Sequence, residues 1–211
     1  MTLTRRTYLK SAALGAAVLA AAGPLGLRSA LAQAWDPAIT DFDAVMGDPN
    51  APVTLIEYAS FTCGHCAHFA TETFDELKTR FIDTGQLRFV FRDFPLDGLA
   101  LRAGMLARCV EGVDYFAVIH ELFASQRQWA TADDPVEALQ RIGQLAGLSE
   151  EAFLACMDND DLANQIIQLR LDGEQQYNVR ATPTFVLNGQ VFSGALPLDE
   201  FVERIEEQLQ S

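Results

Sequence analysis

The chain has 211 residues, with 29 acidic against 15 basic side chains and a formal net charge of −14 at pH 7. A surface with this charge repels nucleic acid and anionic membranes, so neither is expected as a partner. The length suits a leader followed by one medium-sized domain, or by a small domain that carries an insertion.

Residues 1–32 have the pattern of an export signal. Arg5-Arg6 and Lys10 precede an apolar Ala/Gly-rich stretch, Pro24 interrupts that stretch, and Ala30–Ala32 resembles a cleavage site. The paired arginines are similar to a twin-arginine signal, with the general secretory route as the alternative. The apolar stretch is too short and too interrupted for a typical membrane-spanning helix. An uncleaved membrane anchor is the competing interpretation. We therefore predict cleavage and a periplasmic location.

The next segments predict a β-α-β unit. After a short leader at 33–43, residues 51–60 form a near-continuous apolar and β-branched run, which is typical of a central strand buried on both faces. Apolar residues then recur at helical spacing from Cys66 to Phe81. A second strand is expected at 86–95, where apolar and polar residues alternate. We expect the two strands to be joined by a right-handed crossover.

From residue 96 the pattern changes to successive helices, with Ser149 at an N-cap position. Asn188-Gly189 then predicts a hairpin of two short strands, and an amphipathic helix is expected at 198–209. The expected helices before the hairpin are 98–111, 113–128, 135–146, 150–157 and 161–177. The order predicts an α/β domain, residues 33–95 and 173–211, with an all-helical insertion at 96–172.

The stretch SFTCGHCAHF contains Cys63 and Cys66, separated by two residues. A zinc site would need four ligands, and the sequence has no second pair at matching spacing. Haem attachment would need a histidine directly after the second cysteine, where this chain has Ala67. An inert disulfide and a redox centre remain, and a CxxC beside a β-α-β unit favours the redox centre. No metal and no cofactor other than a redox-active disulfide is expected.

The predicted secondary structure favours a reactive thiolate at Cys63. This residue is expected at a helix N-terminus, where free backbone N–H groups and the helix dipole stabilise negative charge. Cys66 follows one turn later on the same face, within reach of a disulfide. His65 can add a positive charge or a hydrogen bond that favours the thiolate further. A stabilised thiolate stabilises the reduced form, which makes the disulfide a stronger oxidant.

The motif Cys63-Gly64-His65-Cys66 after a strand, with Thr182-Pro183 opening a late strand, resembles the thioredoxin superfamily. The run Phe91–Leu96 (FRDFPL) and the helical insertion are similar to its DsbA branch of periplasmic disulfide oxidases. The resemblance implies a thioredoxin fold with an inserted all-helical domain. It also implies a function, namely that a monomer donates the Cys63–Cys66 disulfide to unfolded exported proteins. A DsbB-like membrane partner linked to quinone would reoxidise the pair.

The resemblance also assigns roles to the cysteines of the motif. Cys63 would be the exposed attacking cysteine, Cys66 the buried resolving cysteine, and His65 a residue that tunes the reduction potential. The best-known members have proline where this chain has Gly64, so the strength of the oxidant stays open.

Pro183 matches the family's cis-proline, which would lie against the disulfide. Thr182 and Gly64 are expected to bind substrate beside it. An ordinary trans proline at the start of a strand is the alternative.

Glu57 is a carboxylate inside an apolar strand, where burial is costly unless the group is paired or neutral. The resemblance places a buried acid beneath the active site at this position. Glu57 would accept the proton of Cys66 or tune the stability of the pair. Alternatively, it emerges at a solvated strand end or pairs with a lysine such as Lys78.

Cys109 and Cys156 fall at apolar positions of two predicted helices. Two interpretations are open: a structural disulfide, which an oxidising compartment favours, and free buried cysteines that act as small apolar residues. Some DsbA-like proteins with four cysteines resemble the first arrangement. We expect His68 on a helix surface and His120 packed between helices.

Two other functions compete with a disulfide oxidase. A disulfide isomerase or reductase could use the same fold and the same CxxC. A peptide-binding chaperone could carry an incidental CxxC.

Overall fold

The computed structural model describes residue 35, residues 37–110 and residues 114–211. The predicted signal peptide at 1–32 lies outside the described residues. A five-stranded sheet has the order β1-β3-β2-β4-β5. β2 and β3 run parallel, as predicted, and the other neighbouring pairs run antiparallel. The strands are β1 (Ala44–Met46), β2 (Val53–Ala59), β3 (Leu87–Asp93), β4 (Thr184–Leu187) and β5 (Gln190–Ser193).

The central strand β2 presents its side chains alternately to two apolar cores. Leu55 and Ala59 belong to the larger core, and Ile56 and Tyr58 belong to a smaller core on the opposite face. Glu57 therefore points to the same face as Leu55 and Ala59. That face is covered by the helical segment that follows β2.

The sequence does not predict β1, the strand at Ala44–Met46. Its three residues are too few to show an alternating pattern. The strand exists because it pairs with an edge of β3, where Val45 lies opposite Val90. Such a short strand depends on tertiary pairing more than on its own propensity.

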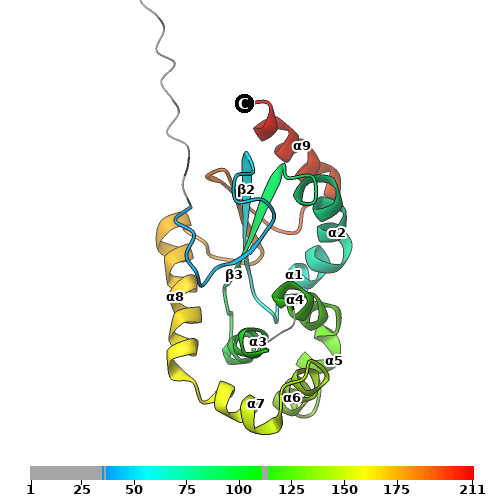
Figure 1. Ribbon diagram of the computed structural model, residues 1–211, viewed down its shortest axis with the longest axis vertical. Coiled ribbons are helices and arrows are strands. Elements are labelled where there is room, and N and C mark those ends of the chain that lie inside the picture. Colours follow the sequence, from blue (N-terminus) through cyan, green and yellow to red (C-terminus); the bar gives the residue numbers. More distant parts are fainter. Residues whose placement is uncertain (1–34, 36, 111–113) are drawn as a thin grey trace, which may run out of the picture. The chain divides into compact units, whose positions relative to one another are not determined.

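One continuous helical segment follows β2 and covers the larger core. Phe69 in this segment lies 4.7 Å from Phe185 and 5.2 Å from Phe201, ring centroid to ring centroid. The segment comprises α1 (Gly64–His68), the π-helical η1 (Phe69–Thr73), α2 (Phe74–Leu77) and the π-helical η2 (Lys78–Ile82). Figure 1 shows α2 and the final helix α9 (Leu198–Leu209) on one side of the sheet, with α8 (Asp160–Tyr177) on the other.

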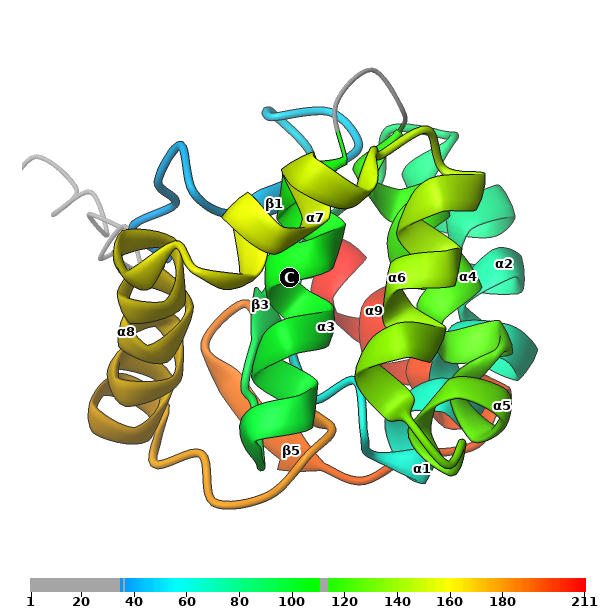
Figure 2. The ribbon, with the colours of Figure 1, turned by 90° about the horizontal axis from the view of Figure 1, so that it is seen from below.

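Between β3 and β4 the described residues are mainly helical, as predicted, and Figure 2 shows α3 (Gly98–Cys109) beside α6 (Pro135–Leu145) and α7 (Glu150–Met157). Ser149 caps α7, because its hydroxyl accepts a hydrogen bond from the Ala152 N–H (3.1 Å). The expected boundary between insertion and α/β domain, at residues 172 and 173, falls inside α8. The helices of this block before α8 are α3 (Gly98–Cys109), α4 (Tyr115–Ala124), α5 (Gln126–Ala130), α6 (Pro135–Leu145) and α7 (Glu150–Met157).

The single helix expected at 113–128 is wrong, because the described part of this segment forms α4 and the start of α5. The break follows from a side chain. The indole N–H of Trp129 donates to the Leu122 carbonyl oxygen (2.7 Å), an acceptor that a continuous helix would use for its own backbone.

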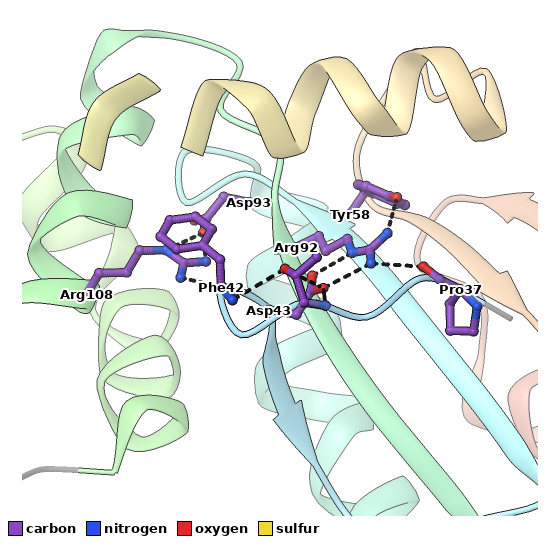
Figure 3. A network of polar contacts seen from close by, with 8 residues as sticks. Pro37, Phe42, Asp43, Tyr58, Arg92, Asp93 and Arg108 are labelled. Carbon is purple, nitrogen blue, oxygen red and sulfur yellow. Dashed lines mark hydrogen bonds and ion pairs between the residues drawn. The ribbon is translucent and has the colours of Figure 1, made fainter. Parts of the chain in front are cut away.

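The buried Arg92 and the partly buried Arg108 attach the segment before β1 to the rest of the domain (Figure 3). Arg92 donates to the Asp43 carboxylate, with its Nε 2.6 Å from Oδ1. Arg108 donates to the Phe42 carbonyl oxygen (2.8 Å) and lies 3.8 Å from the centre of the Phe42 ring. The same Arg108 pairs with Asp93 at the end of β3 (2.7 Å). The segment is therefore held against both the sheet and α3.

The hairpin between β4 and β5 turns at Asn188 and Gly189, as predicted. Both residues have positive φ, 44° and 88°, which the mirror-image hairpin turn requires and which glycine adopts without strain. The Asn188 side chain accepts a hydrogen bond from the Thr54 N–H (2.9 Å). The turn therefore also anchors the start of β2.

Candidate active site

Cys63 and Cys66 lie at the corner where β2 passes into α1. Cys63 is the N-cap residue of α1. Its carbonyl oxygen accepts a hydrogen bond from the Ala67 N–H (3.1 Å), and its own N–H donates to the Ser60 carbonyl oxygen (3.0 Å). Both cysteines are free thiols in this structure. The Cys63 side chain is half-buried at the surface, whereas Cys66 is fully buried. The corner thus presents one sulfur and shields the other.

The surroundings of Cys63 lower its pKa from 9.0 to about 5. The largest cause is the hydrogen bond from the Cys66 thiol. Hydrogen bonds that involve Thr182 and the backbone N–H groups of Cys66 and His65 lower the pKa further, and partial burial opposes them. At neutral pH Cys63 is therefore a thiolate, the form that acts as a nucleophile and as a good leaving group.

Cys66 has the opposite protonation preference. Burial, the hydrogen bond to Cys63 and the nearby Glu57 carboxylate all raise the pKa of the Cys66 thiol. Cys66 therefore stays protonated and donates to the Cys63 sulfur. The two cysteines of one motif are thus pushed to opposite protonation states by their environments.

Glu57 lies buried beneath this corner, with 3% of its surface exposed. Its Oε1 atom has no hydrogen-bond partner among the described residues. Burial, and then the charge of Cys63, raise the pKa of Glu57 well above its usual value. Both alternatives to a buried acid are wrong, because the strand end is not solvated here and Lys78 instead pairs with Asp83 (2.8 Å).

The loop before β4 completes the surface around Cys63. The peptide bond between Thr182 and Pro183 is cis, so the alternative of a trans proline is wrong. The Cys63 sulfur lies 3.3 Å from the Thr182 carbonyl oxygen. The fold therefore brings together the CxxC motif and the Thr182-Pro183 motif.

Gly64 and His65 are the exposed residues between the cysteines. His65 acts on Cys63 through its backbone N–H. His68 is exposed on α1, as expected. His120 is also exposed, so its expected packing between helices is wrong. On α4 the buried side is formed by apolar residues such as Leu122 and Phe123, which leaves His120 on the solvent side.

A family model described as Thioredoxin matches residues 40–207 of the chain. The chain belongs to the thioredoxin family. Disulfide bond formation protein D of Bacillus subtilis, a curated relative, is 30% identical, over 78% of this chain and 76% of that protein. A Rickettsia conorii relative, whose name proposes a protein-disulfide oxidoreductase, is 32% identical over 82% of this chain. The chain spans about three fifths (62%) of the length of that relative.

Two solved structures superpose on this thioredoxin-family chain. α-DsbA1 of Wolbachia pipientis is 32% identical with a TM-score of 0.74, covering 82% of this chain and 93% of its own. BdbD of Bacillus subtilis is 25% identical with a TM-score of 0.67, covering 79% and 92%. The expected thioredoxin fold with an inserted helical domain, and the resemblance to the DsbA branch, are confirmed.

The two other cysteines of this DsbA-like chain form a disulfide inside the insertion. Cys109 at the end of α3 is bonded to Cys156 of α7, with an S–S distance of 2.05 Å. The alternative of two free cysteines is therefore wrong. Among residues 35, 37–110 and 114–211, no group of three or more His, Cys, Asp or Glu side chains is arranged to hold a metal ion.

Gln126 of α5 contacts the active-site corner, and the sequence-based candidates do not include it. It is 8% exposed, and its side-chain amide donates to the carbonyl oxygens of Phe61 (2.8 Å) and Cys63 (3.0 Å). A glutamine among Arg127, Gln128 and other polar residues gives no sign that it is buried. Only the packing of the insertion on the corner reveals the contact.

Proposed function

We propose that this chain is a thiol–disulfide oxidoreductase that passes the Cys63–Cys66 disulfide to substrate proteins. The observation that carries the proposal is the unequal pair: a half-buried Cys63 whose pKa is about 5 beside a buried, protonated Cys66. The names of the relatives and of the solved structures support the same chemistry.

The exchange follows from this asymmetry. In the oxidised enzyme a substrate thiolate attacks the Cys63 sulfur; a substrate–Cys63 bond forms, the Cys63–Cys66 bond breaks, and Cys66 leaves as a thiolate. A second substrate thiolate then attacks the substrate sulfur of this mixed disulfide, and Cys63 leaves. The substrate loses two electrons and the enzyme becomes the dithiol. Because Cys63 has the lower pKa, it is the better leaving group in the second step.

Glu57 is suited to the proton transfer at Cys66. The thiolate that leaves in the first step is buried and needs a proton, because its pKa is raised. Glu57 interacts electrostatically with Cys66, and its raised pKa keeps the carboxyl group protonated at pH values where an exposed glutamate is ionised. We therefore assign Glu57 the role of proton donor in this direction and of proton acceptor in reoxidation.

The loop at Thr182 and Pro183 is suited to hold the substrate backbone. The Thr182 carbonyl oxygen lies 3.3 Å from the Cys63 sulfur. In the oxidised form the Cys63 sulfur carries no proton, so this acceptor is free for a substrate N–H. Exposed Gly64 leaves room at the same surface, since no atom from outside its immediate neighbours and the backbone of its own helix lies within 4 Å of the position where its Cβ would be.

We place the activity in the periplasm, where unfolded exported proteins are the substrates. The twin-arginine-like N-terminus and the Cys109–Cys156 disulfide support an oxidising compartment. In the part of the chain that the structure describes, no helix is long and apolar enough to cross a membrane. A DsbB-like quinone-linked membrane protein would reoxidise the dithiol, and the enzyme would act as a monomer.

The test is an oxidative refolding assay in which the oxidised protein converts a reduced substrate. Cys63→Ser should abolish activity. Cys66→Ser, incubated instead with the disulfide form of the substrate, should accumulate a mixed disulfide on non-reducing gels: the Cys63 thiolate attacks the substrate disulfide, one substrate thiolate leaves, and no Cys66 thiol is present to release Cys63. His68→Ala, an exposed change on the same helix, is the control and should keep full activity. Full activity of Cys63→Ser would instead support a chaperone with an incidental CxxC.

A further inference from the structure

The helical insertion reaches the active-site corner through one side chain, Gln126. A single nitrogen, Nε2, donates both of its hydrogens, one to the Phe61 oxygen (2.8 Å) and one to the Cys63 oxygen (3.0 Å). Among neutral side chains only Asn and Gln carry two donors on one nitrogen, so Met or Leu could not replace these bonds. The partners lie 65 and 63 positions earlier in the chain, so the contact is purely tertiary.

The two acceptors lie on either side of the turn that positions the reactive sulfur. The Phe61 carbonyl belongs to the segment that leaves β2. The Cys63 carbonyl is the first acceptor of α1, where it also binds the Ala67 N–H (3.1 Å). One amide group therefore ties the end of the strand to the beginning of the helix, and fixes the direction in which α1 starts.

The insertion holds Gln126 rigidly at this place. Phe123 of α4 stacks on Phe61, with ring centroids 4.9 Å apart. The Trp129 indole N–H binds the Leu122 carbonyl oxygen (2.7 Å) and so fixes the angle between α4 and α5. Phe123, Trp129 and Gln126 are all buried. The position of the amide group is thus set by the packing of the insertion on the corner.

We propose that Gln126 is a positioning residue for disulfide exchange, which sets the reactivity of the Cys63 thiolate by holding the two corner carbonyls. This inference rests on the function proposed above. It assigns the insertion a part in the chemistry, through Cys63, in addition to any part in binding substrate.

Two physical effects act in the same direction. The Cys63 carbonyl oxygen carries partial negative charge close to the sulfur of the same residue, and a donor on that oxygen reduces its repulsion of a thiolate. Gln126 also keeps the first turn of α1 in the orientation in which the backbone N–H groups of His65 and Cys66 stabilise the thiolate. Loss of the amide should therefore disfavour the thiolate and, through it, the reduced form of the enzyme.

The test is the substitution Gln126→Met, which keeps the length of the side chain and removes both donors. Gln128→Met, at an exposed position of the same short helix, is the matched control. The thiolate of Cys63 is titrated in the reduced protein by its absorbance at 240 nm, and the pair is equilibrated with glutathione. In Gln126→Met we expect the titration midpoint to rise and the pair to be about two- to tenfold less oxidising, the range of one hydrogen bond. Gln128→Met should match the wild-type protein in both the titration midpoint of Cys63 and the equilibrium of the cysteine pair with glutathione.

The variant Gln126→Glu covers the case in which Gln126→Met does not fold. It keeps the side-chain size and places a carboxylate near the corner, so the midpoint should rise in it as well. The titratable groups that interact with Cys63, namely Cys66 and Glu57, are unchanged in every variant. A wild-type midpoint in either folded variant would overturn the inference. The titration needs no substrate, so it gives an answer even if the proposed function fails in the refolding assay.

Discussion

The Cys63 sulfur and the Thr182 carbonyl oxygen lie 3.3 Å apart, although 119 positions separate the two residues in the sequence. The contact joins the start of α1 to the cis-proline loop, so the half-buried Cys63 sulfur and this loop form one continuous surface. Because Cys66 is buried on the other side of the corner, a substrate can reach the disulfide only at Cys63.

Reduced protein should react with iodoacetamide at one site, Cys63, and the rate should follow a titration with a midpoint near pH 5. The reason is that the thiolate is the reactive form, and the hydrogen bond from Cys66 lowers the pKa of Cys63 from 9.0. Mass spectrometry of the alkylated peptides checks the site, and stopped-flow rates from pH 3 to pH 9 check the midpoint. A midpoint near pH 8 to 9 would contradict the account.

Glu57→Gln should stabilise the protein at neutral and alkaline pH and slow disulfide exchange. The pKa of Glu57 is raised in the folded state above its usual value of 4.5, so the folded protein holds this proton more tightly than the unfolded chain. Stability from this group is complete below about pH 4.5 and is lost as the pH rises, because ionisation of the buried carboxyl is then favoured only in the unfolded chain. Glutamine stays neutral, so the gain over wild type should grow with pH.

Chemical denaturation of Glu57→Gln and wild type at pH 4, 6 and 8 measures this difference. Glu72→Gln, an exposed change on η1, serves as the control and should leave both stability and exchange rate near wild type. A pH-independent difference between Glu57→Gln and wild type would argue against an uncompensated buried carboxyl group.

Removing the disulfide of the insertion by Cys109→Ala and Cys156→Ala should cost about 4 kcal/mol of unfolding free energy in the chain-entropy model. The bond closes a loop of 47 positions, and the loss of that constraint favours the unfolded chain. Urea denaturation of the double variant measures the loss. A loss below about 1 kcal/mol would show that the insertion holds its shape without the bond.

Asp43→Ala should destabilise the fold by about 3–5 kcal/mol, because it leaves the Arg92 guanidinium buried without its carboxylate. The side chains of Arg92 and Asp43 are 5% and 0% exposed. Asp83→Ala is the matched control, since the Lys78–Asp83 pair has side chains 38% and 50% exposed and should contribute less than about 1 kcal/mol. Equal losses in the two variants, measured by urea denaturation, would refute the importance of the buried pair.

The sequence predicts the parts of the fold whose signals are local. The apolar run of β2, the helical spacing from Cys66 to Phe81 and the Asn188-Gly189 turn each span about sixteen residues or fewer, and the structure has all three elements. The catalytic motif is recognisable for the same reason, because two cysteines at a strand-to-helix corner form a local pattern. Glu57 could be singled out because a carboxylate in a buried strand is unusual.

The features that escaped prediction depend on tertiary contacts. β1 forms because β3 offers it a free edge, and the break between α4 and α5 depends on where the Trp129 indole finds an acceptor. The exposure of His120 follows from which side of α4 packs inward. The sequence around Gln126 does not reveal its role, because a polar residue among polar neighbours gives no indication that its side chain binds the Cys63 carbonyl oxygen.

The reduction potential of the Cys63–Cys66 pair tests the central claim most directly. Equilibration of the purified protein with glutathione redox buffers, followed by separation of the dithiol and disulfide forms, gives the value. Because the thiolate of Cys63 stabilises the reduced form, we expect a potential between those of protein disulfide isomerase and DsbA, about −180 to −120 mV. A potential near that of thioredoxin, about −270 mV, would contradict the oxidase and favour a reductase.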